Sequence, residues 1–157
     1  MVSMIDEDTQ HICAASGAMA ATVRGLPGDG ATGNVAISRS LSVCGHVVSS
    51  TETLIVEDIA RDPRFASNPV LRERGLRFYG GVPLCDAAGA VYGTLCLLDT
   101  KPRSFTEREV RLLESMALEL MSSVLGQASG LKLAAQTTQL VDLRELSSAA
   151  VGQPVPE

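Results

Sequence analysis

Residues 77–100 read RFYGGVPLCDAAGAVYGTLCLLDT, two apolar runs joined by a short turn. The runs cover residues 78–85 and 90–98, and both odd and even positions are largely apolar in each. Between them, Asp86 suits the first position of a type I turn and Gly89 the fourth. The pattern predicts an antiparallel hairpin. Since a strand that is apolar on both faces is buried on both faces, we expect the hairpin in mid-sheet, with helices over one face and a candidate ligand pocket over the other.

Three glycines interrupt these strands: Gly80, Gly81 and Gly93. A residue without a side chain lets a neighbouring segment or a small molecule come close to the backbone. Glycines in strands also mark β-bulges. The sequence leaves both interpretations open.

The composition indicates one acidic globular domain. The chain has 157 residues, 45% of them hydrophobic, which is typical of a domain with its own core. A net charge of -5 leaves no basic footprint for nucleic acid and disfavours binding to anionic membranes. No apolar run approaches the roughly 20 residues that cross a bilayer, and the opening MVSMIDEDTQ lacks the features of a signal peptide. We therefore expect a cytoplasmic protein.

The four cysteines, Cys13, Cys44, Cys85 and Cys96, lie in apolar segments without CxxC spacing. Such thiols are usually buried and reduced, because a free cysteine packs as a small hydrophobic residue. With only two histidines in the sequence, a metal site is not expected.

The residues before the hairpin predict a second antiparallel pair and a short helix. Residues 2–5 and 11–15 flank an acidic turn, and the glycine-rich residues 16–36 predict a long loop with a short strand at its N-terminal side. Because the first strand opens the chain, we expect the helix that would normally precede the sheet to be missing or truncated. Ser40 is the predicted N-cap of a helix that ends near residues 49–50, and residues 53–57 predict a further strand.

A loop with two prolines follows and concentrates positive charge in this acidic chain. Its arginines are Arg61, Arg64, Arg72, Arg74 and Arg77. They are interpreted either as a solvated face or as an anion-binding rim over a pocket.

The C-terminal part begins with a capping box formed by Thr106 and Glu109. An apolar stripe at alternating three- and four-residue steps predicts a helix of about twenty residues that ends near Gly126. The stripe comprises Val110, Leu113, Ala117, Leu120 and Val124. It fits a dimer interface and packing against the chain's own sheet equally well. We expect residues 1–127 to form the domain and residues 128–157 a helical extension or linker with a disordered tail.

In this order the segments resemble a GAF domain of the bacterial sensor type. The matching motifs are VED at 56–58, DPRF at 62–65, FYGGVPL at 78–84, GTLCLLD at 93–99 and PRSFT at 102–106. Their combined order is specific, whereas any one motif alone is weak. The resemblance implies an α+β fold with a central antiparallel sheet of five to six strands, flanked by helices, and a small-molecule pocket on one side.

The resemblance also implies a regulatory domain of a signal-transduction protein. Such a domain binds a small ligand and passes the change through its terminal helices to a kinase, a cyclase or a transcription regulator, none of which is present in this chain. It further implies a homodimer formed through flanking helices. It does not identify a ligand or a cofactor.

The resembling family includes one enzyme class, the free methionine-R-sulfoxide reductases. Cys44, in VCGHVV, resembles one of their cysteines, but the loop within residues 60–70 that should carry the attacking cysteine reads ARDPRFASNP. We therefore do not expect an enzyme. Relatives that bind cyclic nucleotides or bilins fit less well, because the Asn-Lys pair of the former and the Cys-His order of the latter are not matched.

The resemblance and the residue chemistry together give candidate pocket residues: Cys44, Arg64, Phe65, Arg77, Tyr79 and Cys96. An arginine, Arg64 or Arg77, would hold an anionic group, and the aromatic rings would hold an apolar part. Two alternatives remain. Either side chains fill the pocket and the domain only dimerises, or Cys44 and Cys96 approach each other as a thiol redox sensor.

Overall fold

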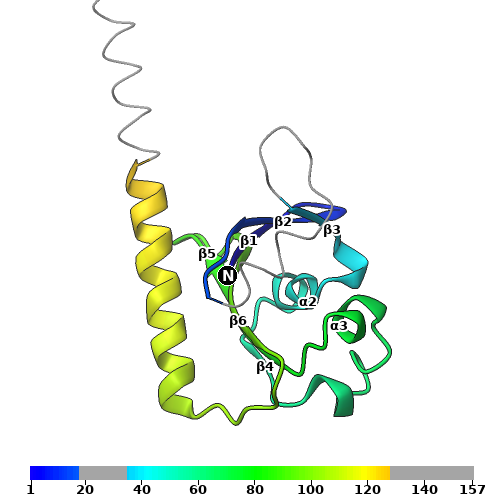
Figure 1. The fold of residues 1–157 in the computed structure, drawn as a ribbon. Coiled ribbons are helices and arrows are strands. Elements are labelled where there is room, and N and C mark those ends of the chain that lie inside the picture. The colour runs from blue at the N-terminus through cyan, green and yellow to red at the C-terminus, as the bar shows by residue number, and fades with distance from the viewer. Residues whose placement is uncertain (18–34, 128–157) are drawn as a thin grey trace, which may run out of the picture. The chain divides into compact units, whose positions relative to one another are not determined.

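The computed structural model of the protein describes residues 1–17 and 35–127 (Figure 1). The chain divides into two compact units, Met1–Met121 and Ser122–Glu157. The first unit contains a six-stranded antiparallel sheet in the order β3-β2-β1-β6-β5-β4. Its strands are β1 (Val2–Ile5), β2 (Thr9–Ala14), β3 (Val35–Ser38), β4 (Leu54–Val56), β5 (Phe78–Cys85) and β6 (Val91–Asp99). The predicted α+β fold with a central sheet of five to six strands is confirmed.

Helices lie on both faces of this sheet. One face carries α2 (Val43–Ser50), η2 (Ile59–Arg61) and α3 (Pro69–Glu73), which share a buried cluster with the sheet, and η1 (Arg39–Leu41) precedes α2 in the chain. Figure 1 shows α2 and α3 on one side of the strands and the helix of residues 107–121 on the other. Tyr79 and Cys96 belong to the buried cluster on the α2 side, whereas Val82 and Leu84 belong to the cluster that faces the long helix. Strand β5 is therefore buried on both faces, as predicted, whereas Tyr92 and Leu97 of β6 are exposed, at 40% and 43%.

The hairpin turn has the predicted geometry. The Asp86 carbonyl accepts a hydrogen bond from the Gly89 amide at 3.0 Å, and Gly89 has φ of 83°. The Asp86 carboxylate also accepts from the amides of Ala88 and Ala90, both at 2.9 Å. One aspartate thus satisfies most of the turn's backbone donors, because its short side chain reaches back over the loop.

The strand glycines make room for protein atoms. A Cβ atom at Gly93 would lie 1.9 Å from the carbonyl oxygen of Ser3, on the neighbouring strand β1. At Gly81 it would meet the Tyr79 ring, 2.3 Å from the hydroxyl, and at Gly80 the Phe78 ring at 3.1 Å. One ladder irregularity adjoins Gly93: Leu84 pairs with Gly93 and Cys85 with Val91, so Tyr92 is an extra residue on β6. Close approach by protein atoms is therefore the correct interpretation at all three glycines, and at Gly93 the bulge interpretation is correct as well.

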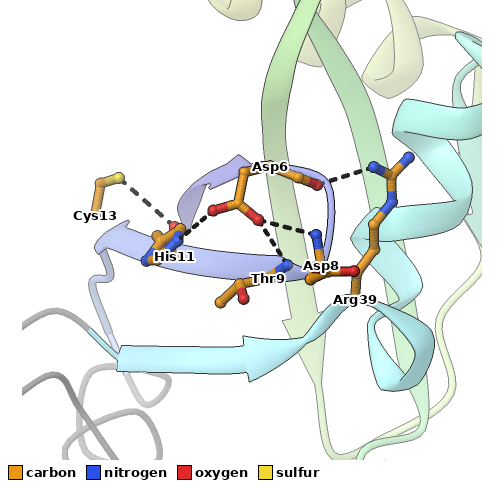
Figure 2. Close-up of polar contacts among 6 residues, drawn as sticks. All are labelled: Asp6, Asp8, Thr9, His11, Cys13 and Arg39. Atoms are coloured by element: carbon orange, nitrogen blue, oxygen red, sulfur yellow. Dashed lines mark hydrogen bonds and ion pairs between the residues drawn. The ribbon is translucent and has the colours of Figure 1, made fainter.

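The first hairpin is organised by Asp6, which Figure 2 shows at its turn. Asp6 Oδ1 accepts from the amides of Asp8 and Thr9, at 3.1 and 2.7 Å, and Oδ2 lies 3.0 Å from His11 Nε2. Arg39 donates to the Asp6 carbonyl at 2.9 Å and so ties this turn to η1. The Asp6 carboxylate accepts the backbone hydrogen bonds of the turn by residue 9, so the turn is complete there. Strand β2 therefore begins at Thr9 rather than at the predicted residue 11. The predicted loop strand falls largely on residues 18–34, outside the described residues, and β3 at residues 35–38 was not predicted.

The short helix starts two residues later than predicted. Ser42, with φ of -92° and ψ of 126°, is the N-cap, and its hydroxyl accepts from the Gly45 amide at 3.1 Å. The predicted cap, Ser40, lies inside η1. Because η1 already turns the chain, the first residue with an extended backbone next to the helix is Ser42, and it takes the capping role.

Residues 107–121 of the first unit are helical, and so are the described residues 122–127 of the second. The capping box is confirmed, since Glu109 Oε2 accepts from the Thr106 amide at 2.8 Å and from its hydroxyl at 2.6 Å. The predicted end at Gly126 is wrong, because residue 127 is still helical. A glycine exposed on a helix and without a positive φ does not act as a terminator.

We predict that Gly93→Ala destabilises the protein by about 3 kcal/mol or more, because the new methyl group would push β1 from β6. Urea unfolding followed by circular dichroism measures this change. The matched control is Gly126→Ala, where a Cβ atom meets nothing within 4 Å. We expect that substitution to be neutral or to stabilise its helix, and equal destabilisation by the two variants would contradict the argument.

Candidate functional site

A small cavity of about 60 Å³ lies between the sheet, α2 and α3. Strands β5 and β6 contribute Tyr79 and Leu98 to its wall, and α2 contributes Cys44. The remaining lining residues are Met1, Gln10, Ile12, Ile37, Leu41, Ser42, Val43, Val70, Leu71, Arg74 and Leu76. Leu41 is exposed, so the cavity reaches the surface beside η1. The wall is mainly apolar with a few polar groups, which is the usual character of a small-molecule site.

Two thiols and a phenol meet at the inner wall of the cavity. The sulfur atoms of Cys44 and Cys96 are 3.8 Å apart, and the Tyr79 hydroxyl donates to Cys44 Sγ at 3.2 Å. All three side chains are nearly inaccessible, with Cys96 0% exposed and Cys44 2% exposed. Cys44 is also the second residue of α2, where the helix dipole favours a negative charge. The predicted approach of these two cysteines is confirmed.

This arrangement separates the acidities of the two thiols. The hydrogen bond from Cys96 is the largest of the effects that lower the pKa of Cys44 to about 6, and Tyr79 and Ser42 add to it against the opposing effect of burial. The contact with Cys44 and burial raise the pKa of Cys96 well above its usual range. Burial likewise raises the pKa of Tyr79. The pair therefore holds its negative charge on Cys44 and its proton on Cys96.

A buried polar network forms part of the cavity wall. Gln10 donates to the Ser3 hydroxyl at 2.8 Å and accepts from the Ser42 hydroxyl, which also caps α2. Gln10 and Ser42 are buried, so these contacts replace the water that both side chains lose. Sequence reasoning missed both residues. Gln10 was assigned to the turn because the strand was predicted to begin at residue 11, and Ser42 was hidden by the misplaced cap.

Three of the six predicted pocket residues lie away from the cavity. Phe65 is buried, with its ring 4.9 Å from that of His46 and the Arg64 guanidinium 5.0 Å above it. Arg77 forms a two-point ion pair with Asp58 at 2.8 and 2.7 Å, and Arg64 one with Asp62 at 3.0 and 2.6 Å. Cys44 and Tyr79 do line the cavity, and Cys96 lies behind Cys44.

The arginine cluster is largely balanced by its own loop. Asp58 also lies 3.7 Å from Arg61, and the hydrogen bonds from Arg77 and Arg64 lower the pKa values of Asp58 and Asp62. These contacts favour the interpretation as a solvated face. Arg74 is the cluster member that lines the cavity.

The apolar stripe of the long helix is divided between two environments. Leu113 and Ala117 are buried against Val82 and Leu84, and Leu120 is partly buried there. Val110 is half-buried, and Val124, in the second unit, is exposed. A separate set of apolar residues in the first unit is exposed: Leu112 at 62%, Met116 at 51% and Leu118 at 69%.

Within residues 1–17 and 35–127, no cluster of three or more histidine, cysteine, aspartate or glutamate side chains is placed to hold a metal ion. None of the helices in that part of the chain combines the length and the apolar character needed to cross a membrane.

The family model of the GAF domain matches residues 3–124 of this sequence. The chain belongs to the GAF domain family. A segment of 85 residues is 38% identical to the cyclic di-GMP phosphodiesterase PA2567 of Pseudomonas aeruginosa. The match covers 53% of this chain and 14% of that protein, so this GAF domain corresponds to a small part of the relative.

Solved structures agree on the fold. The GAF domain of a phosphoenolpyruvate-protein phosphotransferase from Acinetobacter has a TM-score of 0.58 at 19% identity, over 82% of this chain and 70% of that one. A domain from a Sinorhizobium meliloti protein assigned to the two-component sensor histidine kinases has a TM-score of 0.56 at 18% identity, over 82% and 79% of the two chains. Both structures share the fold of this GAF domain.

We predict that a thiolate forms in the folded GAF domain as pH rises through about 6, because the pKa of Cys44 is lowered to that value. An ordinary thiol ionises near pH 8.5. Titration of the thiolate absorbance in the ultraviolet measures this step. It should be absent in Cys44→Ser and should move to higher pH in Tyr79→Phe, which loses the hydrogen bond to the thiolate. A wild-type titration with no thiolate below pH 8 would contradict the assignment.

Proposed function

We propose that this GAF domain is the ligand-sensing regulatory domain of a signal-transduction protein. The observation that carries the proposal is the cavity between α2, α3 and the sheet, whose mainly apolar wall contains a few buried polar groups. Such a wall binds the apolar part of a small molecule by burial and orients its polar part by hydrogen bonds. The charge of Arg74 at the wall favours a ligand with an anionic or strongly polar end.

The size of the cavity limits the ligand. Its volume of about 60 Å³ is well below the roughly 300–1,000 Å³ of a site for a drug-sized molecule. A ligand of a few heavy atoms fits without rearrangement. A nucleotide would require α3 and η1 to move away from the sheet, so we propose a small metabolite or ion as the occupant.

The β5–β6 hairpin provides a route from the cavity to the long helix. Tyr79 of β5 lines the cavity, and Val82 and Leu84 of the same strand contact Leu113, Ala117 and Met121 on the opposite face. Because closely packed layers transmit small displacements, a change in the cavity would alter how residues 107–121 rest on the sheet. We propose that this helix relays the signal to an effector outside this chain.

The contents of the loop within residues 60–70 favour a regulatory role over catalysis. The loop within residues 60–70 brings Phe65 into the core and pairs Arg64 with Asp62, and it supplies no nucleophile to the cavity. A catalytic thiol from this loop is therefore not part of the proposal.

We expect native mass spectrometry of the purified domain to show a retained small mass per protein chain. The cavity-filling variant Val70→Phe should lose that mass, because residue 70 lines the cavity. The control is Arg72→Phe, an exposed position on the same helix, which should keep it. Circular dichroism checks that both variants fold. Wild-type protein that remains free of added mass after incubation with a pool of small metabolites would contradict the ligand proposal.

We also propose a homodimer through the exposed face of the long helix. Because Leu113 and Ala117 are used inside the chain, we propose that a second copy contacts Leu112 and Met116, which are exposed and four positions apart on one face of the helix. Burying such apolar side chains between copies removes them from water.

The double variant Leu112→Glu/Met116→Glu should convert a dimer into a monomer, because it places charge in the apolar contact. Light scattering coupled to size-exclusion chromatography measures the mass of the particle. The control, Arg111→Glu, changes charge on the same helix outside the apolar set and should leave the dimer intact. A wild-type monomer at high protein concentration would exclude this interface.

A further inference from the structure

Cys44 and Cys96 form a dithiol pair that ligand sensing does not use. Their sulfur atoms are 3.8 Å apart although the residues are 52 positions apart in sequence, on α2 and β6. Cys44 lines the cavity and Cys96 does not. We propose that this pair is a redox site in which a small hydroperoxide enters the cavity, oxidises Cys44, and leaves a disulfide between Cys44 and Cys96.

Which of the two thiols a peroxide in the cavity can reach decides which one attacks and which one resolves. Cys44 faces the cavity beside Leu41, whose exposure marks the way to the surface. Cys96 is 0% exposed and does not line the cavity, and its sulfur lies 3.8 Å from that of Cys44. The cavity volume of about 60 Å³ is several times the roughly 10–15 Å³ needed to hold one water molecule, so it admits hydrogen peroxide. Cys44 is therefore the attacking thiol and Cys96 the resolving one.

The reaction consumes one peroxide and two thiols. The Cys44 thiolate attacks one oxygen of the peroxide, the O–O bond breaks, and sulfenic acid forms on Cys44 while hydroxide leaves. The Cys96 thiol then attacks the Cys44 sulfur, the S–O bond breaks, and a second water departs once the hydroxide has taken up a proton. The two sulfurs are oxidised by two electrons in total, and the peroxide is reduced to two molecules of water.

The surroundings of Cys44 favour the first step. The Tyr79 hydroxyl donates to Cys44 Sγ, and the position in the first turn of α2 adds the field of the helix N-terminus. The hydrogen bond with Cys96, followed by smaller ones that include that of Tyr79, lowers the pKa of Cys44, so the nucleophilic thiolate is present at neutral pH. Cys96 keeps its proton and can release it as the disulfide forms.

Disulfide formation would change the cavity. The sulfur atoms must approach from 3.8 Å to about 2.0 Å, which requires the first turn of α2 and strand β6 to move together. Ser42, at the start of α2, is hydrogen-bonded to Gln10 in the cavity wall. Oxidation therefore acts on the same wall that a ligand would contact, although the redox site does not depend on ligand binding.

The remaining two cysteines lie outside this site and can be removed without touching it. Cys13 is exposed on β2, where its thiol lies 3.6 Å from the His11 carbonyl (Figure 2), and Cys85 is half-buried at the end of β5. Replacing both by serine, in Cys13→Ser/Cys85→Ser, leaves the pair as the remaining thiols.

The test treats this double variant with one equivalent of hydrogen peroxide and measures its intact mass. We expect the loss of two hydrogen atoms, reversal by dithiothreitol, and a Cys44–Cys96 cross-link in the peptide map. Adding Cys96→Ser should instead give a sulfenic acid on Cys44 that dimedone traps, and adding Cys44→Ser should abolish the reaction. An unchanged mass, or oxygen added to Cys96 while Cys44 stays reduced, would overturn the proposal. Because the first measurement leaves both thiols in place, it does not depend on how the pair's variants fold.

Discussion

Burial of strand β5, in the β5–β6 hairpin, on both faces is the constraint on which the rest of the structure depends. Val82 and Leu84 fill the core under the long helix, while Tyr79 and Cys96 fill the core under α2. Because side chains alternate along a strand, a shift of one residue would exchange the two sets. The turn at Asp86 and the ladder with β6 therefore fix both cores at once.

The candidate site follows from how one of these cores is packed. Tyr79 lies over Gly81 with its hydroxyl group in the interior, and a buried hydroxyl needs a partner. The partner is Cys44, which the N-terminal turn of α2 brings over the sheet beside Cys96. The packing of an aromatic side chain thus creates a polarised thiol at the wall of the cavity. The hydrogen bond that satisfies the buried Tyr79 hydroxyl is therefore also one that lowers the pKa of Cys44.

The correct predictions rest on interactions between residues close together in the sequence. The features that the sequence did not reveal depend on contacts between residues far apart in it. The hairpin turn and the Thr106 capping box were predictable because donor and acceptor lie within a few residues. The pairing of Arg77 with Asp58 spans 19 positions, so the pattern that suggested an anion-binding rim could not reveal that the charge was already balanced. Gln10 was equally hidden, because its burial depends on Ser42, 32 positions away. The proximity of Cys44 and Cys96 was predictable only through the resemblance to the GAF family.

In the proposed relay, the hairpin couples the cavity to the long helix. Methionine methyl NMR tests it directly, because Met121 is buried against the hairpin and Met116 is exposed on the same helix. Filling the cavity with Val70→Phe should shift the Met121 signal and leave that of Met116 in place. If both signals stay unchanged while the resonances of cavity residues move, the two faces of the sheet are independent and the account of signal relay is wrong.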